Sequence, residues 1–125
     1  MEFDFVTRTQ PQIGSPLQGI VRNAAGGVDF AGSVHLFPIG AGQRNIVKIQ
    51  YTGSRGGDYS AANQLAGFGN SRKAPVGFVW HHLDDYDSTT NTGSMQLVLR
   101  EVHEAINPHY GGVAQFQRAT GKRYK

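Results

Sequence analysis

The sequence predicts an α+β fold built from short strands and short helices in one domain. Seventeen glycines and five prolines divide the 125 residues into short pieces, which argues against a helical bundle. Runs of β-branched and aromatic residues predict strands, and apolar stripes at helical spacing predict helices. A chain of this length buries roughly two-thirds of its unfolded surface, which is enough for one hydrophobic core.

The first half of the chain is expected to form a hairpin and a helix. Residues 1–30 are rich in glycine and proline and predict an irregular arm or linker, so the packed domain is expected over residues 31–125. Residues 33–37 and 45–51 are β-rich runs separated by turn residues, which predicts a β-hairpin. Asp58 is expected to cap a helix over residues 59–66, which Gly67 ends.

The second half predicts a strand, strand, helix unit. Residues 78–82 are aromatic and β-branched, residues 83–94 form a polar loop, and residues 95–99 return as a second strand. Residues 100–106 predict a helix, with Val102 and Ile106 on one face. Asn107 should end this helix, because the residue before a proline is driven out of the helical region.

Composition restricts the chemistry that the chain can perform. The sequence contains no cysteine, so any metal ion must be held by His, Asp, Glu or Asn, and no disulfide can form. No apolar run of about 18 residues occurs, and the N-terminus lacks the order of a signal peptide. We therefore expect no membrane-spanning segment and no export signal within this sequence.

The net charge of +3 is distributed unevenly. Residues 1–79 carry seven Lys or Arg against four Asp or Glu, residues 80–109 carry one against five, and residues 110–125 carry four against none. An acidic centre between basic segments suits a cation site beside a surface that binds a polyanion. An ordinary solvated surface with a basic tail explains the same pattern equally well.

Four of the five histidines lie within residues 81–109, which predicts a site that combines a metal ion with a base. His81 and His82 are neighbours on a predicted strand and point to opposite faces, so one ion cannot bind both without distortion. His103 and His109 would diverge on a continuous helix, but the break at Pro108 can fold His109 back. Imidazoles from strand end, helix and turn could then converge on one ion and leave a position open for water and phosphate.

Other notable residues have simpler interpretations. His35 stands in a β-rich run beside Leu36 and is expected to be a strand residue without a ligand role. Trp80 shares a strand with Phe78 and is expected in the core rather than on a base-stacking surface. An acidic turn accounts for the three aspartates of the loop better than a cation site does, namely Asp84, Asp85 and Asp87.

These motifs resemble one family of nucleases. Four segments together resemble the Trp-His-His branch of the HNH/endonuclease VII superfamily: residues 78–82 (Phe-Val-Trp-His-His), residues 95–98 (Met-Gln-Leu-Val), His103 and residues 109–114. Upstream, residues 51–55, 58–59, 62–63 and 66–67 resemble the segment that precedes the histidine pair in that branch. The resemblance covers about residues 46–115. Such domains lie at the C-termini of bacterial polymorphic toxins and are related to colicin-type DNases.

The resemblance implies a ββα-metal (His-Me finger) core and a role for each residue of the motif. It implies one divalent metal ion (Zn, Ni, Mg or Mn) held by His81, His103 and His109, with His82 as the general base. Gln96 stands where many members have an asparagine that fastens the loop between the strands. Two departures are the glutamine itself and the spacing from His103 to His109, which is longer than the four-residue spacing of colicin-type enzymes.

The expected function is therefore a metal-dependent endonuclease that hydrolyses DNA with little sequence specificity. Water is the nucleophile, so no 2′-hydroxyl is required. Candidate phosphate contacts are Arg55, Arg100, Arg118, Lys122 and Arg123, and residues 118–125 are expected to add only charge. The alternatives are an RNase (tRNase) toxin and a non-catalytic, zinc-stabilised module that binds nucleic acid.

The resemblance also implies a biological setting. It implies an antibacterial toxin domain, secreted or injected as part of a larger delivery polypeptide that lies N-terminal to it. The site of action would be the cytoplasm of the target bacterium. A cognate immunity protein is the implied partner, and it should be acidic if it masks the basic face that binds substrate.

Overall fold

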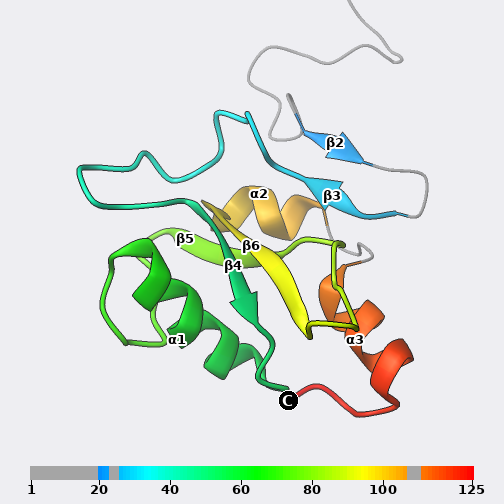
Figure 1. Cartoon of the computed structure of the whole chain (residues 1–125). Helices are drawn as coiled ribbons and strands as arrows, with labels where there is room; N and C mark the ends of the chain where they lie inside the picture. Colours follow the sequence, from blue (N-terminus) through cyan, green and yellow to red (C-terminus); the bar gives the residue numbers. More distant parts are fainter. Residues whose placement is uncertain (1–19, 23–25, 107–110) are drawn as a thin grey trace, which may run out of the picture.

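The computed structural model describes residues 20–22, 26–106 and 111–125, which form a mixed structure of short strands and helices (Figure 1). The expected α+β class is confirmed. The elements in chain order are β2 (Val21–Arg22), β3 (Val28–Asp29), β4 (Ile46–Gln50), α1 (Arg55–Ala66), β5 (Phe78–His82), β6 (Thr92–Leu99), α2 (Arg100–Ala105) and α3 (Gly112–Thr120).

A three-stranded antiparallel sheet organises the fold. Its strand order is β4-β6-β5, so β6 is central and β5 forms one edge. Trp80 pairs with Leu97 across β5 and β6, and Val47 pairs with Met95 across β4 and β6. Helix α2 follows β6 directly, which confirms the strand, strand, helix unit that the sequence predicts.

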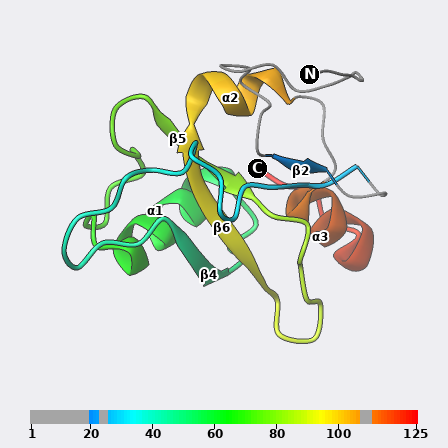
Figure 2. The same ribbon diagram turned by 90° about the horizontal axis from the view of Figure 1, so that it is seen from above.

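The sheet separates two hydrophobic cores. On one face Trp80, Leu97 and Ile49 pack with residues of α1 and with Phe116 of α3. On the other face Val98 packs with β3 and α2. Figures 1 and 2 show α1 and α2 on opposite sides of the sheet. Side chains that alternate along β5 therefore enter two different environments.

The expected hairpin between residues 33–37 and 45–51 is wrong. Residues 46–50 form β4, which pairs with β6 rather than with residues 33–37. Val47 and Ile49 are buried while the alternate residues of β4 are exposed, so pairing with β6 places this apolar face over α1. Residues 33–37 contribute only an isolated bridge between Leu36 and Val98.

The irregular arm expected over residues 1–30 is wrong for residues 28–30. Strands β2 and β3 pair as an antiparallel ladder, and Val28 and Phe30 are buried in the core beside α2. The glycines that predict irregularity stand before this strand. The apolar residues that follow them cover the face of β5 and β6 that α2 leaves open.

Helix α1 begins earlier than expected, because Ser54 caps it instead of Asp58. The Ser54 side chain accepts a hydrogen bond from the Gly57 N–H, and the helix starts at Arg55. Gly67 ends the helix as predicted, with a left-handed φ of 92°. Asp58 thus lies in the first turn, and its side chain is buried and free for another role.

Helix α3 is not predicted by the sequence. It lacks a capping side chain at Gly111, and its two leading glycines look like a loop. Gly112 is required there, because a side chain at this position would collide with the Tyr51 ring. Among the described residues, no helix is long and apolar enough to cross a membrane.

Candidate functional site

The end of β5 places two adjacent histidines in different environments. His81 lies on the face of the sheet that packs against β3 and α2, where its ring contacts the Phe30 ring. His82 lies on the face of α1, where it contacts Asp58. Both are buried, with 1% and 8% of their surface exposed. The prediction that the two imidazoles point to opposite faces is confirmed.

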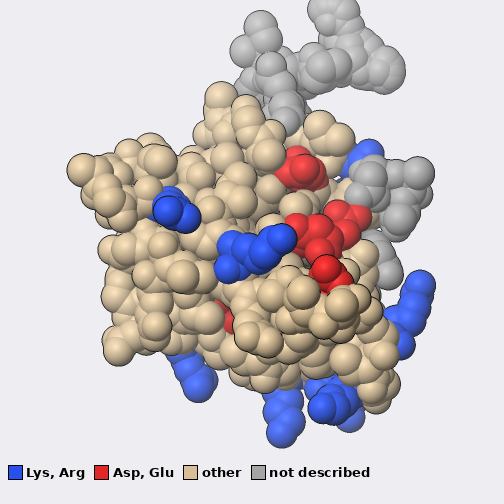
Figure 3. Space-filling view, in the orientation of Figure 1, with Lys and Arg blue, Asp and Glu red and all other residues tan. Residues whose placement is uncertain are grey.

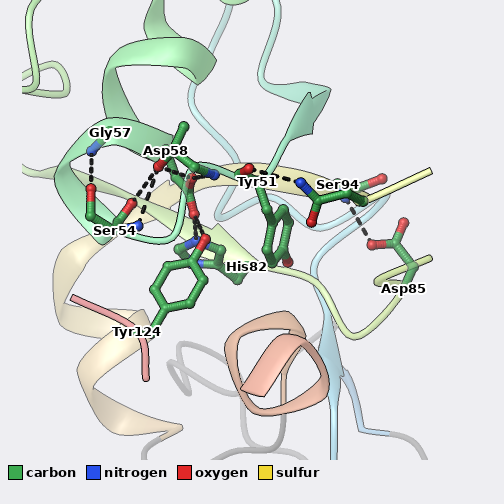
Figure 4. A network of polar contacts seen from close by, with 10 residues as sticks. Tyr51, Ser54, Gly57, Asp58, His82, Asp85, Ser94 and Tyr124 are labelled. Carbon is green, nitrogen blue, oxygen red and sulfur yellow. Dashed lines mark hydrogen bonds and ion pairs between the residues drawn. The ribbon is translucent and has the colours of Figure 1, made fainter. Parts of the chain in front are cut away.

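His82 is held by a buried carboxylate. Its Nε2 lies 2.8 Å from Oδ2 of Asp58, which is fully buried in the first turn of α1. Figure 4 shows Asp58 between this imidazole and the chain around Ser54, with the Tyr124 ring beside it. The Tyr124 hydroxyl donates to the same Oδ2. Thr52 donates to Oδ1 through its backbone N–H at 2.9 Å and its hydroxyl at 2.7 Å.

These hydrogen bonds decide the charge of Asp58. Burial by itself would raise the pKa of the carboxyl, but the bonds from His82, Tyr124 and Thr52 outweigh burial and lower the pKa below its ordinary value. The opposite applies to Tyr124, whose pKa is raised by burial and by the neighbouring Asp58. At neutral pH the cluster therefore holds an ionised carboxylate and a neutral phenol.

This arrangement fixes the chemistry available to His82. An ionised carboxylate accepts the proton on Nε2, so the neutral imidazole presents the lone pair of Nδ1. A proton taken up at Nδ1 would create an imidazolium that Asp58 stabilises. His82 is thus arranged to act as a base, with Asp58 as a residue that positions it.

His81 is arranged differently. Its Nε2 lies 2.7 Å from the Val28 carbonyl oxygen, which can only accept, so Nε2 carries the proton and Nδ1 carries the lone pair. A hydrogen bond from the second ring nitrogen to a backbone carbonyl is the usual support of an imidazole that ligates a metal. Strand β3 provides that support for His81.

His103 of α2 lies beside His81, as the sequence predicts. The two ring centroids are 5.3 Å apart with the planes inclined at 67°. Two imidazoles that bind one tetrahedral ion through nitrogens at about 2.0–2.1 Å have centroids roughly 5 Å apart. The separation and the tautomer of His81 therefore fit a shared divalent ion. His109, the third expected ligand, lies outside the described residues. Within the described residues, no three His, Asp or Glu side chains converge to hold an ion.

Gln96 does not fasten the loop between β5 and β6. Its side chain is buried opposite His81, where its Oε1 accepts from the Phe30 N–H at 2.9 Å and its Nε2 donates to Asp29 at 2.7 Å. Gln96 cannot reach the loop, because residue 96 points to the face of the sheet that β3 covers. Gln96 instead holds β3 over His81.

The loop from residue 83 to residue 91 is fastened by other polar side chains. Asp85 accepts from the Ser94 N–H, and Gln115 of α3 bonds both the Tyr86 N–H and the Asp84 carbonyl. Asp87 accepts from the Thr89 N–H. These contacts are those of a folded acidic turn, which agrees with the simpler interpretation. In Figure 3 most of the visible acidic side chains form one group with basic side chains beside it, and several further basic side chains project from the lower rim.

The candidate phosphate contacts divide into two places. The Arg55 guanidinium lies 5.9 Å from the centroid of the Tyr124 ring, so the first turn of α1 and the C-terminal tail bring basic groups together. Arg118 belongs to α3, and Lys122 and Arg123 follow it as exposed residues. Arg100 is exposed at the start of α2 and lines a groove with other residues.

The expectation that residues 118–125 add only charge is wrong. Tyr124 is buried, packs against Phe116 and donates to Asp58. The Lys125 N–H donates to the Gly53 carbonyl at 2.9 Å, which ties the tail to the segment before α1. The tail therefore completes the surroundings of His82.

Two residues of the site, Asp58 and Tyr124, are missed by sequence reasoning. Asp58 is 24 residues from His82 and has the pattern of a helix cap, and Tyr124 stands in a basic tail. The only signal was the resemblance of residues 58–59 to the segment that precedes the histidine pair, which gave no role.

One family model matches part of the chain. Residues 70–119 match the model of the WHH family, described as a nuclease of the HNH/ENDO VII superfamily with conserved WHH. This segment includes Trp80, both histidines of β5 and His103, whereas Asp58 and Tyr124 lie outside it. No curated protein and no solved structure matches the chain.

Proposed function

We propose that the chain, whose residues 70–119 match the model of the WHH family of nucleases, is a metal-dependent DNA endonuclease whose general base is His82. The observation that carries the assignment of the base is the 2.8 Å contact between His82 Nε2 and the buried, ionised Asp58. A buried carboxylate that fixes the tautomer of an imidazole is the arrangement of a positioned base.

In the proposed reaction His82 Nδ1 takes a proton from water as the water oxygen attacks phosphorus. The bond from phosphorus to the 3′ oxygen breaks, and that oxygen leaves with the bonding electrons. Asp58 stabilises the imidazolium that forms and keeps its ring in place. Tyr124 and Thr52 hold the carboxylate in turn, so the base is supported before substrate arrives.

His81 and His103 would hold the divalent ion, with His109 as the proposed further ligand. When bound, the ion supplies Lewis acidity toward a phosphate oxygen and stabilises negative charge on the leaving group. Two contacts hold His81 in position on this side of the sheet. The Val28 carbonyl accepts a hydrogen bond from His81, and Gln96 holds β3 in place by accepting from the Phe30 N–H.

The scissile phosphate must meet groups from both faces of the sheet, so we place it at the end of β5. β5 is an edge strand, and Cα atoms of neighbouring residues are only about 3.8 Å apart, so groups from both faces can meet around this edge of the sheet.

DNA is the proposed substrate because attack by water does not require a 2′-hydroxyl. The basic groups around the tail and α1 would contact phosphates without reading bases, so cleavage should show little sequence preference. RNA is the alternative, and digestion of plasmid DNA and of tRNA under the same conditions distinguishes the two.

The test is plasmid nicking by the purified protein with Mg²⁺, Mn²⁺, Zn²⁺ or Ni²⁺. His82→Ala should lower the rate by on the order of 10²–10⁴, while its affinity for the ion stays as in the parent protein, because the base does not ligate. His35→Ala is the matched control, since His35 lies in a different part of the fold, and it should cleave normally. Full activity of His82→Ala would remove His82 from the mechanism.

The proposed setting is an antibacterial toxin domain that an acidic immunity protein neutralises. The sequence resemblance supports this setting, and so do the basic groups beside the site, which an acidic partner would cover. Expression in the bacterial cytoplasm should arrest growth, whereas expression of His82→Ala should not. Equal growth of cells that express the active enzyme would contradict the toxin role.

A further inference from the structure

A second surface beside His82 combines aromatic and basic side chains. A groove of about 650 Å³ opens along β5, at the edge of the sheet. Its aromatic lining is Tyr59, Phe78 and Trp80, and its basic lining is Arg72, Lys73 and Arg100. The volume lies within the usual range of ligand pockets, about 300–1,000 Å³.

The charge of the groove has one sign. Arg72 and Lys73 are exposed, as is Arg100, and no acidic side chain is among the described residues that line it. Arg72 also lies against the first turn of α1, close enough that a side chain at Gly56 would contact its guanidinium. The groove therefore complements a chain of phosphates.

The apolar part of the groove is held in place from behind. The Trp80 Nε1–H donates to the Asn63 side chain at 2.8 Å, and the Phe78 ring packs edge-on against Phe37. At the rim, Val76 is 99% exposed, in a turn where Gly77 has a φ of 85°. The fixed rings of Tyr59 and Phe78 provide an apolar surface that phosphates cannot use.

The groove lies next to the proposed base. Tyr59 lines the groove, and its ring centroid is 6.1 Å from the centroid of the His82 ring. A nucleic acid that follows the groove past Tyr59 would therefore pass close to His82.

We propose that this groove binds an unpaired stretch of the nucleic acid beside the cleavage point, with bases against Tyr59 and Phe78 and phosphates on Arg72, Lys73 and Arg100. In a duplex the base faces are stacked inside the helix, so only an unpaired base can use the apolar surface. The inference rests on the proposed nuclease function and adds a preference for single-stranded or locally opened substrate.

The test is a binding measurement that does not depend on cleavage. A short fluorescein-labelled single-stranded DNA of mixed sequence and the duplex of the same sequence are titrated with the protein in EDTA, and fluorescence anisotropy is recorded. The single strand should bind about tenfold or more tightly than the duplex, because stacking of even one base has an effect of that order.

Two sets of variants locate the binding. Replacing Arg72 and Lys73 together by Gln removes two charges, and Val76→Asp places a carboxylate at the rim; all three sites are exposed, so folding should be kept. Both should weaken single-strand binding about tenfold. Val76→Asn matches the size without the charge, and Lys48→Gln removes an exposed charge from β4 at the opposite edge of the sheet. Both controls should bind as the parent protein does, and thermal melts check that every variant is folded.

Unchanged binding by the groove variants would overturn the proposal. Equal or tighter binding of the duplex would also overturn it, and so would no binding of either DNA. Because His82 takes no part in this assay, a nuclease mechanism that fails in the nicking test leaves the binding result interpretable. If the groove variants lose binding and His82→Ala still nicks DNA normally, His82 is not the general base, whereas the proposal for the groove stands.

Discussion

The two histidines of β5 differ in the group that accepts their Nε2 protons. The acceptor of His81 is the neutral carbonyl of Val28, and the acceptor of His82 is the ionised carboxylate of Asp58. A carbonyl fixes the tautomer without adding charge, which suits a ligand for a cation. A carboxylate also stabilises a protonated ring, which suits a base. The proposed roles, His81 as a metal ligand and His82 as a base, therefore follow from the group that accepts the Nε2 proton of each ring.

Asp58→Asn tests the role of the carboxylate. The amide keeps the shape but can present its NH₂ group to His82, which favours the wrong tautomer and cannot stabilise the imidazolium. We expect cleavage to fall by on the order of 10²–10⁴, with metal affinity unchanged and an altered dependence of rate on pH. Full cleavage with a parental pH profile would show that Asp58 is only structural.

Asp58 should also give the protein acid-sensitive stability. Its folded pKa is lowered, so the ionised form is favoured by folding, and this contribution is fully present above the unfolded value of about 3.9. The contribution is lost as the pH falls through the folded pKa. Urea unfolding from about pH 6 to about pH 3 should show a steeper decline for the parent protein than for Asp58→Asn. Parallel curves would contradict the pKa direction.

At the scale of elements, local pattern predicts some pieces and long-range packing decides the others. Strand β5 has the predicted bounds, and α2 ends at Ala105, one residue before its predicted end. The partner of β4 was not predictable, because its alternating pattern fits any strand with a matching face. Helix α3 was missed because contact with Tyr51, rather than a cap, defines where it starts.

The C-terminal tail has a structural role, although the sequence predicts that it adds only charge. Tyr124→Phe removes one hydrogen bond to a buried carboxylate and keeps the ring, so the free energy of unfolding should fall by about 1.5–3 kcal/mol. The double replacement of Lys122 and Arg123 by Gln removes only exposed charge and should change it by less than about 0.5 kcal/mol. Urea melts measure both. If the free energy of unfolding falls more in the charge variant than in Tyr124→Phe, the tail acts through its charge rather than through Tyr124.

The whole molecule brings distant parts of the chain to one strand. Four residues from different elements surround the end of β5: Val28 of β3, Asp58 of α1, His103 of α2 and Tyr124 of the tail. The motif histidines could be identified from the sequence because they cluster within it. The residues that define their protonation could not, because a three-stranded sheet with two covered faces is needed to bring them close.

A shared ion would link these parts, so metal should stabilise the whole fold. Binding to the folded chain alone raises the free energy of unfolding by about 2.7 kcal/mol at 100 times the dissociation constant. Added Zn²⁺ should therefore raise the melting temperature of the parent protein and of His82→Ala, but not of His81→Ala or His103→Ala, which lose a ligand from β5 or α2. If Zn²⁺ stabilises both proteins and only the parent protein nicks DNA, while His82→Ala does not, the protein is an enzyme. The same stabilisation with no nicking by the parent protein would instead identify a zinc-stabilised binding module, and equal stabilisation of all four proteins would place the ion elsewhere.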